Sequence, residues 1–310
     1  MGSSYVPNAH LGLLSWLYFA YIHSHISLHT STDFPPYKDS SIQAAADKKT
    51  RPAPAQPLPL VERTNELSLE EFTSNYVPTS LLEIEIRPRR RIGQEADESA
   101  QDDERKMEKY TLDIYTANSI PKSDFESCFR LVELTSSGDY ANSGTGWSPT
   151  KKKREMKLPD MRYLILRPGS DDAAVRHEGE TRLSDSAQRR EEEVLGFLSF
   201  MVTYEDGKEV IYCYEIHLSP AVQGRGLGKQ LIKRCEEIGR RVGLEKSMLS
   251  VFRSNTRALN MYTTSGYTVD EFSPPPRKLR NGTVKEAEYL IMSKVLKDSR
   301  EDRERSDKGQ

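Results

Sequence analysis

The chain has 310 residues, with 45 Lys and Arg against 47 Asp and Glu and a formal net charge of −2. A balance this close to neutral argues against a global positive field that would recruit nucleic acid, so no direct nucleic-acid partner is expected. Charged residues make up 30% and hydrophobic residues 36% of the chain. This mixture predicts a folded domain that is diluted by solvated segments.

Three cysteines, Cys128, Cys213 and Cys235, are widely spaced and lie in apolar patterns. Such cysteines are expected to be reduced core residues, as in proteins of the cytoplasm and nucleus, where we expect this chain to act. A nucleophilic role for Cys213 is the less favoured alternative. Neither cysteine nor histidine spacing indicates a metal site, so no metal is expected.

Residues 1–60 are predicted to form a disordered tail, and residues 298–310 a second one. The apolar stretch 11–22 is shorter than the roughly 20 residues that a transmembrane helix needs, so no membrane contact is expected. No Lys or Arg precedes it, which argues against a secretory signal. Residues 30–60 are polar and proline-rich, as in an extended linker.

Residues 61–297 are predicted to form one domain with charged insertions near 87–109 and 168–193. Its first half reads as a helix over 62–76 that Pro78 ends, a strand at 81–86, a strand at 110–115 and a helix over 122–135. A loop rich in Gly, Ser and Asn follows at 136–146 and carries Tyr140. Its aromatic residue is either tucked against the core or placed at the lip of a site.

The second half begins with a buried strand at 161–166. Residues 194–204 and 210–218 then form a predicted hairpin around the turn 205–207. A helix over 227–242 follows, because apolar residues recur there every three or four positions. Strands are expected at 247–252, 267–272 and 288–295, with a basic loop before the last one.

The stretch 223–228, Gln-Gly-Arg-Gly-Leu-Gly, joins the strand ending at Leu218 to the helix starting at Leu227. A glycine-rich turn at the start of a helix presents free N–H groups to an anion such as phosphate; the alternative is a plain tight turn. The Walker pattern is excluded because Gly228-Lys229 is followed by Gln230, and the spacing also differs from the dinucleotide fingerprint.

The stretch does match the Q-x-x-G-x-G turn of the GNAT N-acetyltransferases, and Asn255, Ala258, Tyr262 and Gly266-Tyr267 match the family pattern that follows it. The chain resembles this family. The resemblance implies an α/β GNAT fold, with a mixed, mostly antiparallel sheet flanked by helices and an extra N-terminal helix. It also implies acetyl-CoA as co-substrate. The residues that it assigns to the cofactor are His217, Leu218, Gln223, Gly224, Arg225, Gly226, Leu227, Gly228 and Asn255.

Blocks at 152–156, 212–216, 225–229 and 248–252, together with Tyr140 and Gly146-Trp147, narrow the resemblance to the NatD family. It covers roughly residues 61–297. It implies a monomeric N-alpha-acetyltransferase whose partners are the N-terminal tails of histones four and two-A, beginning Ser-Gly-Arg-Gly. Thr145 and Thr203 stand where that family has a Trp and an Asp. The alternatives are an acetyltransferase for lysine side chains or small amines, and a catalytically silent acetyl-CoA-binding scaffold.

Glu215 is a candidate general base, because a carboxylate on an apolar strand is costly unless it is hydrogen-bonded or used, and burial is expected to raise its pKa. The residues alone leave a structural carboxylate equally open, and the resemblance favours the catalytic role. Strict alternation would separate Tyr212 from Glu215, so the two share a pocket only if a β-bulge lies between them. With the resemblance, Tyr212 joins Glu215 as a catalytic candidate, and Tyr262 becomes a possible proton donor to the leaving thiolate. The substrate-binding candidates are Tyr140, Tyr212, Tyr214 and Glu205.

Overall fold

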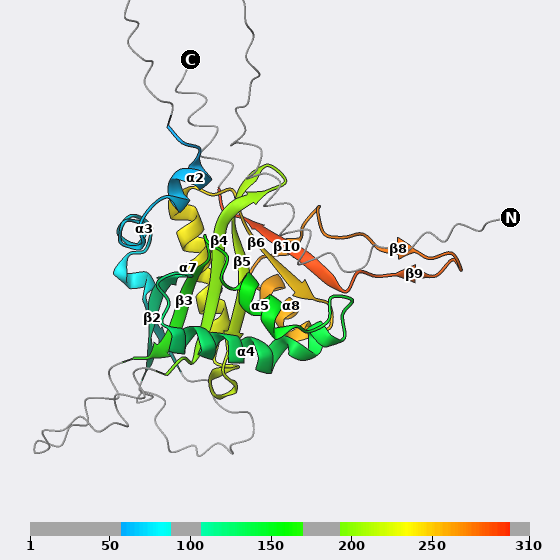
Figure 1. Cartoon of the computed structure of the whole chain (residues 1–310), viewed down its shortest axis with the longest axis horizontal. Helices are drawn as coiled ribbons and strands as arrows, with labels where there is room; N and C mark the ends of the chain where they lie inside the picture. The colour runs from blue at the N-terminus through cyan, green and yellow to red at the C-terminus, as the bar shows by residue number, and fades with distance from the viewer. Residues whose placement is uncertain (1–56, 88–106, 170–192, 298–310) are drawn as a thin grey trace, which may run out of the picture.

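The computed structural model describes residues 57–87, 107–169 and 193–297. The two predicted tails and the two predicted insertions therefore lie almost wholly outside the described residues. The described part forms one mixed sheet with helices on both faces (Figure 1). In these segments, no helix is both long and apolar enough to cross a membrane.

The main sheet has eight strands in the order β1-β2-β3-β4-β5-β6-β10-β7. Their bounds are β1 Glu83–Ile86, β2 Glu108–Thr116, β3 Arg162–Pro168, β4 Gly196–Glu205, β5 Lys208–Leu218, β6 Lys246–Phe252, β10 Tyr289–Val295 and β7 Thr268–Val269. Among these strands, β5 and β6 pair in parallel, while the other neighbours pair antiparallel. The predicted α/β class with a mostly antiparallel mixed sheet is confirmed.

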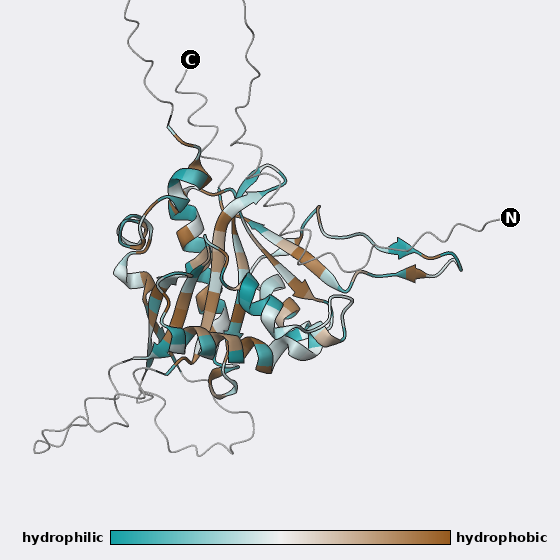
Figure 2. Cartoon of the chain, viewed as in Figure 1, coloured by the Kyte–Doolittle hydropathy of each residue, from teal (hydrophilic) through white to brown (hydrophobic). Residues whose placement is uncertain are grey.

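Two helical layers cover the sheet. Helices α4 (Lys122–Ala141) and α5 (Pro149–Glu155) lie on one face, where Phe197 and Met201 of β4 join their core. Helix α7 (Leu227–Val242) covers the other face, where Leu198 and Phe200 meet it. Because β4 is buried on both sides, it is apolar at nearly every position, and Figure 2 shows hydrophobic strands between helices with polar outer faces.

The N-terminal segment forms two short helices, α2 (Leu60–Asn65) and α3 (Leu69–Tyr76). The single helix predicted over 62–76 is therefore wrong. A capping box explains the break, because the Ser68 side chain accepts from the Glu71 N–H while the Glu71 carboxylate accepts from the Ser68 N–H. This pair starts a new helix where apolar spacing alone suggested continuity.

Arg162, at the first position of β3, fastens this segment to the sheet. Its guanidinium donates to the Asn65 side chain at 3.1 Å and to the Thr64 carbonyl at 3.2 Å. It also lies over the ring of Phe72, 4.2 Å from the centroid. Phe72 is fully buried and its ring is 6.4 Å from that of Phe200. The segment is thus part of the main core.

Four other differences from the predicted elements concern the site or its rim. Helix α4 continues to Ala141, so Tyr140 lies on a helix and not in a loop. Helix α5 was not predicted, and neither was the small hairpin of β8 (Arg277–Lys278) and β9 (Val284–Lys285) in the expected basic loop. The strand predicted at 267–272 shrinks to β7. Helix α8 (Thr256–Thr263) follows β6, and the predicted hairpin of β4 and β5 is confirmed, with Asp206 and Gly207 at positive φ.

We predict that Phe72→Ala lowers the free energy of unfolding by about 3–5 kcal/mol, because it removes a fully buried ring and leaves a cavity. Urea denaturation of the variant and the parent chain measures this difference. Glu70→Ala, on the exposed side of the same helix, is the matched control and should change stability little. A small effect of Phe72→Ala would show that the N-terminal helices are not part of the cooperative core.

Candidate active site

The parallel pairing of β5 with β6 ends half-way along both strands. The ladder runs from Val210 opposite Lys246 to Cys213 opposite Leu249, although β5 continues to Leu218 and β6 to Phe252. Beyond Cys213 the strands diverge (Figure 1). Residues 215–218 of β5 therefore lie beyond the ladder with β6.

A β-bulge lies at the point where the strands part. Ser199 of β4 faces Glu215, whereas the next residue, Phe200, faces Cys213, so Tyr214 is the extra residue. Cys213 consequently packs in the core under α7. Tyr212 and Glu215 turn to the opposite face, which confirms the expected change of parity between them.

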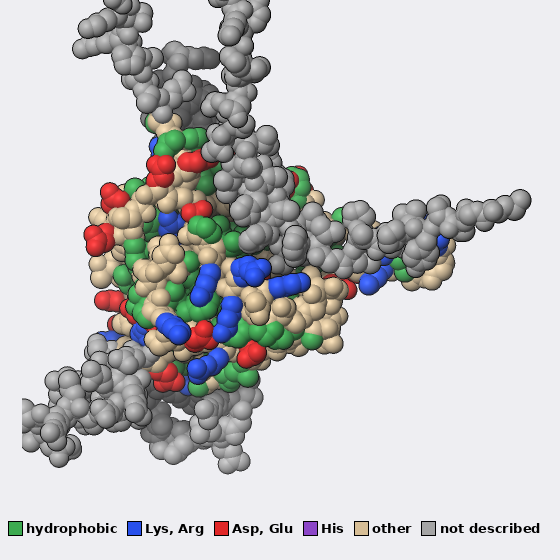
Figure 3. Space-filling view, in the orientation of Figure 1, with side chains coloured by type: hydrophobic (Ala, Val, Ile, Leu, Met, Phe, Trp, Pro, Cys, Tyr) green, Lys and Arg blue, Asp and Glu red, His purple; other side chains and the backbone are tan. Residues whose placement is uncertain are grey.

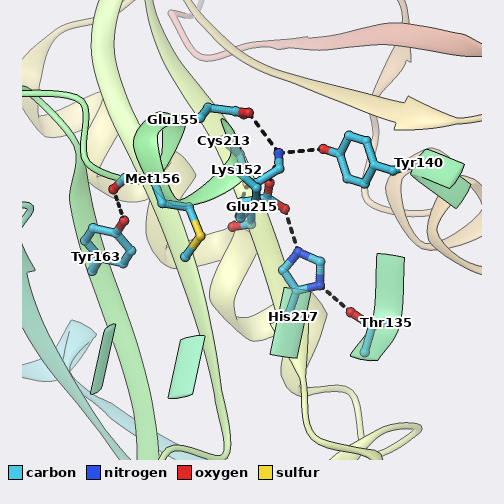
Figure 4. A network of polar contacts seen from close by, with 9 residues as sticks. All are labelled: Thr135, Tyr140, Lys152, Glu155, Met156, Tyr163, Cys213, Glu215 and His217. Atoms are coloured by element: carbon cyan, nitrogen blue, oxygen red, sulfur yellow. Dashed lines mark hydrogen bonds and ion pairs between the residues drawn. The ribbon is translucent and has the colours of Figure 1, made fainter. Parts of the chain in front are cut away.

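Glu215 is buried on that face and is held from two sides (Figure 4). Its Oε1 accepts from the Lys152 ammonium at 2.8 Å, and its Oε2 lies 2.6 Å from His217 Nε2. Lys152 comes from α5 and is itself 4% exposed. The carboxylate therefore sits between a buried ammonium and a buried imidazole.

The hydrogen bonds of His217 assign its protons. The Thr135 hydroxyl donates its single proton to the Leu131 carbonyl at 2.7 Å, so Thr135 Oγ1 accepts from His217 Nδ1, 2.5 Å away. The Nε2 atom on the other side of the ring faces the Glu215 carboxylate. The ring also stacks on Phe197, with 5.5 Å between centroids. The imidazole is thus locked in place by α4 and β4.

The electrostatics of Glu215 differ from the sequence prediction. Burial raises the pKa of this carboxyl, but Lys152 and His217 together outweigh burial and hold the pKa below its ordinary value. The expectation that burial would raise the pKa is wrong because two partners were not foreseen. Burial likewise disfavours the Lys152 ammonium, yet Glu215, Glu155 and Tyr140 raise the Lys152 pKa well above its usual range. The pair is an ion pair at neutral pH.

Tyr140 closes the site from the end of α4. Its hydroxyl accepts from Lys152 at 2.7 Å, and its ring meets Trp147 and Phe252, with centroids 5.8 and 5.0 Å away. Two further bonds tie this rim to the other side of the gap. The Ser254 hydroxyl donates to Asp139 at 2.6 Å, and the Gly144 N–H donates to Glu288 at 2.8 Å. These contacts hold the segment around Tyr140, which is called the rim below, against the loops on the other side of the gap.

The remaining substrate candidates lie together near the hairpin end of β5. The rings of Tyr212 and Tyr214 are 5.3 Å apart, and the Tyr212 hydroxyl is 2.6 Å from that of Ser250. Burial, with smaller contributions from Asp206 and Asp270, raises the pKa of Glu205 to about 8. A simply solvated turn carboxylate would not behave in this way, so Glu205 belongs to a partly desolvated site.

Tyr262 of α8 is buried in the core under α7, with its ring 5.9 Å from that of Tyr267. Burial raises its pKa well above the usual value, and Cys213 and Glu215 add to that rise. The hydroxyl thus keeps its proton at neutral pH, within electrostatic reach of Glu215. A group that protonates a leaving thiolate must itself still be protonated at neutral pH.

The glycine turn has the geometry of an anion site. Gly224 and Gly226 have φ of 80° and 91°, and Gly226 is the N-cap of α7. A Cβ at Gly226 would meet nothing within 4 Å, whereas one at Gly228 would lie 2.9 Å from Met261 Sδ. Gly226 therefore faces open space beside the free N–H groups of the first helical turn, while Gly228 permits α8 to pack closely.

The other residues predicted to hold the cofactor have internal partners. Gln223 donates to the Leu218 carbonyl and accepts from Arg257, and Arg225 donates to both Glu108 oxygens at 3.0 Å. The Asn255 side chain accepts from the Ala258 N–H and caps α8. Leu227 is fully buried. These side chains shape the turn and the start of α8, and a bound ligand would meet mainly backbone there.

Sequence reasoning missed Lys152, Glu155 and Thr135 as members of the site. Lys152 belongs to the run 151–154, Lys-Lys-Lys-Arg, which reads as a solvated surface. Lys and Arg side chains do gather on this side of the molecule (Figure 3), but Lys152 alone of the four is buried. Across the described segments, no group of three or more His, Cys, Asp or Glu residues has the geometry of a metal site.

Comparisons with known proteins agree with this geometry. Residues 155–267 match the family described as the acetyltransferase (GNAT) family. N-alpha-acetyltransferase 40 of Saccharomyces cerevisiae is 34% identical over 102 residues, which cover 27% of this chain and 36% of that protein. The matched residues thus span about a third of the length of this curated relative.

Solved structures with a similar arrangement include the GNAT domain of S. lividans PAT, at 13% identity. The alignment covers 71% of this chain and 99% of that chain, with a TM-score of 0.42. Arabidopsis thaliana NAA60 in complex with a bisubstrate analogue is 12% identical. The alignment covers 60% of this chain and 98% of that chain, with a TM-score of 0.39. The matched segment 155–267 spans the bulge, the glycine turn and α8, so this part of the chain is similar to the GNAT acetyltransferases.

Proposed function

We propose that this protein transfers the acetyl group of acetyl-CoA to the free N-terminal amine of a protein substrate. Histone tails that begin Ser-Gly-Arg-Gly are the proposed substrates, in the cytoplasm and nucleus. The observation that carries the proposal is the position of Glu215, an ionised and buried carboxylate at the point where β5 and β6 part. A thioester in that gap and an amine at the rim would meet beside it.

The end of β5 and the turn fit acetyl-CoA. The extended arm of the cofactor carries amide groups, which match the backbone of 215–218 that lies beyond the ladder with β6. Its pyrophosphate matches the N-terminal end of α7 at Gly226. The thioester would then lie toward Tyr262 and Glu215.

The reaction forms a bond between the amine nitrogen and the acetyl carbon and breaks the bond from that carbon to sulfur. A free α-amine has a pKa near 8, whereas Glu215 is held below its ordinary value, so Glu215 takes no proton from a resting ammonium. The nitrogen becomes strongly acidic once it has attacked the thioester. At that stage Glu215 accepts its proton, directly or through a water, and Tyr262 protonates the leaving thiolate.

The rim supports an N-terminal amine over a lysine side chain. Tyr140 and Trp147 stand on a rim that packs against Phe252 of β6 and is hydrogen-bonded to the loop between β6 and α8 and to the loop before β10. Such an enclosure suits a chain end, which can enter without a second chain segment leaving the site. A lysine amine has a pKa near 10.4 and would also reach the site neutral less often.

We predict that Gly226→Glu weakens acetyl-CoA binding at least tenfold, as measured by calorimetric titration, because a carboxylate would occupy the place of the pyrophosphate. Gly243→Glu is the matched control. Gly243 caps the other end of the same helix at φ 94°, also with nothing within 4 Å of its Cβ, so both variants carry the same backbone strain. Equal loss of affinity in the two variants would remove this turn from the cofactor site.

We predict that Glu215→Gln lowers kcat about 10²–10⁴-fold while the Kd for acetyl-CoA changes by less than about twofold. Gln keeps the volume but cannot take the proton. The assay uses peptides starting Ser-Gly-Arg-Gly with a free or an acetylated N terminus, and mass spectrometry locates the product. Glu209→Gln, earlier on the same strand, is the control. Acetylation of a lysine in the blocked peptide would instead support a side-chain acetyltransferase.

We predict a pH-dependent preference for a basic third residue in the peptide. Glu205, with a pKa of about 8, is mostly neutral at pH 7 and ionised at pH 9, and only the carboxylate attracts a guanidinium. The ratio of KM for a peptide with Gln to KM for one with Arg at position three should therefore rise between pH 7 and 9. This ratio cancels the titration of the α-amine, which both peptides share. In Glu205→Gln the ratio should stay flat; a rise there would place the recognition elsewhere.

A further inference from the structure

The cluster in Figure 4 contains a buried cation that the acetyl-transfer chemistry has not required. Resting on the proposed function, we propose that Lys152 is a positioning residue of the reaction: it fixes the orientation and ionisation of Glu215 and links that carboxylate to Tyr140 at the substrate rim. Lys152 acts through Glu215 and does not exchange protons with the substrate.

The contacts of Lys152 use its full donor capacity. An ammonium has three N–H donors and no acceptor. Its Nζ lies 2.8 Å from Glu215 Oε1, 3.0 Å from Glu155 Oε2 and 2.7 Å from the Tyr140 hydroxyl. Three acceptors at these distances satisfy all three donors. A further donation to a substrate would break one of these bonds, which excludes Lys152 as a substrate ligand or as the base.

Helix α5 holds Lys152 in a fixed place. The Ser148 side chain accepts from the Lys151 N–H and caps the helix, with Pro149 at its first position. At the other end, Met156 is buried, and its carbonyl accepts a hydrogen bond from the Tyr163 hydroxyl of β3. A seven-residue helix has little stability of its own, so these end contacts are what keep the ammonium against Glu215.

The charge balance of the cluster depends on Lys152. The titratable groups that interact electrostatically with Glu215 come from several neighbouring elements: Tyr140 of α4, Lys152 and Glu155 of α5, Tyr163 of β3, Cys213 and His217 of β5, and Tyr262 of α8. Lys152 and His217 are the ones that favour the carboxylate. Without Lys152, only His217 would offset the free-energy cost of burying the Glu215 carboxylate, and the nearby Glu155 carboxylate would make that burial still less favourable.

The bond to Tyr140 gives the cation a second role. Because the Tyr140 oxygen accepts from Lys152, its own O–H must point away from that ammonium. Lys152 thereby constrains both the Tyr140 hydroxyl and the Glu215 carboxylate. A change in the position of the Tyr140 hydroxyl should therefore alter the position of the Glu215 carboxylate, and the reverse should hold as well.

The test compares Lys152→Met with Lys153→Met. Lys153 is the next residue along α5, but its ammonium pairs with Glu126 at the surface, where both side chains are 35% exposed. The first measurement needs no activity: the Glu215 side-chain carboxyl carbon is titrated by NMR in the full chain, with Glu215→Gln assigning its signal. Lys152→Met should raise the Glu215 pKa by at least about one unit, and Lys153→Met should leave it unchanged.

The second measurement is the pH profile of kcat/KM. The wild-type pKa is depressed, so Glu215 stays ionised down to acidic pH. In Lys152→Met the acid limb should move to higher pH by the same amount as the NMR titration, while the acetyl-CoA Kd is retained. Adding Lys152→Met to Glu215→Gln should then change kcat/KM by less than about twofold, because a residue that acts through Glu215 has nothing left to act on.

An unchanged Glu215 pKa in a folded Lys152→Met chain overturns the proposal, whatever the enzyme acetylates. Additive loss in the double variant overturns it as well, because it would show an independent role. If Lys152→Met does not fold, Lys152→Gln replaces it, since Gln still donates to Glu215 without a charge and should raise the pKa in the same direction. A wild-type chain that acetylates no peptide refutes the proposed function, and the NMR titration still decides the role of Lys152.

Discussion

The extra residue at Tyr214 is the constraint on which the rest of the site depends. It turns Cys213 into the core under α7 and Glu215 toward α4 and α5. It also lies where β5 leaves β6, so the same irregularity opens the sheet and aims the carboxylate into the region beside the opening. Without it, Glu215 would point into an apolar core that offers it no partner, and the parallel pair would close along its length.

The buried polar cluster carries a cost that the fold meets by complete pairing. A carboxylate, an ammonium and an imidazole in one desolvated place would be unfavourable singly. Here each receives a partner from a different element: α5 supplies Lys152, β5 supplies Glu215 and His217, and α4 supplies Thr135. The cluster therefore depends on correct docking of both helices on the sheet. It adds specificity to that docking even if its net free energy is small.

Much of this was predictable from local sequence patterns. The hairpin followed from its turn residues and the glycine turn from its glycines, whereas the bulge was expected only through the resemblance, which gives Tyr212 and Glu215 a shared role. Each of these signals lies within a few residues of the feature that it specifies. The resemblance to the GNAT family then connected them into one fold.

The features that were missed depend on contacts between distant segments. The run of basic residues that holds Lys152 has no apolar period, so nothing local marked α5 as a helix or one of its lysines as buried. The predicted direction of the Glu215 pKa shift was wrong because Lys152, 63 residues away in the chain, acts together with the nearby His217 to outweigh burial. Helix α4 outlasted its predicted end because Tyr140 packs on Phe252 of β6.

The ties between the rim and the far side of the gap have a consequence for the thermodynamics of substrate binding. Asp139 with Ser254, and Gly144 with Glu288, hold the end of α4 in place before any peptide arrives. The conformational entropy of this rim is therefore lost during folding, and ordering the rim adds no further entropic cost when a ligand binds. For the proposed peptide substrate, association should then show a small heat-capacity change, limited to the apolar surface of the peptide's first residues, without the larger change that accompanies coupled folding.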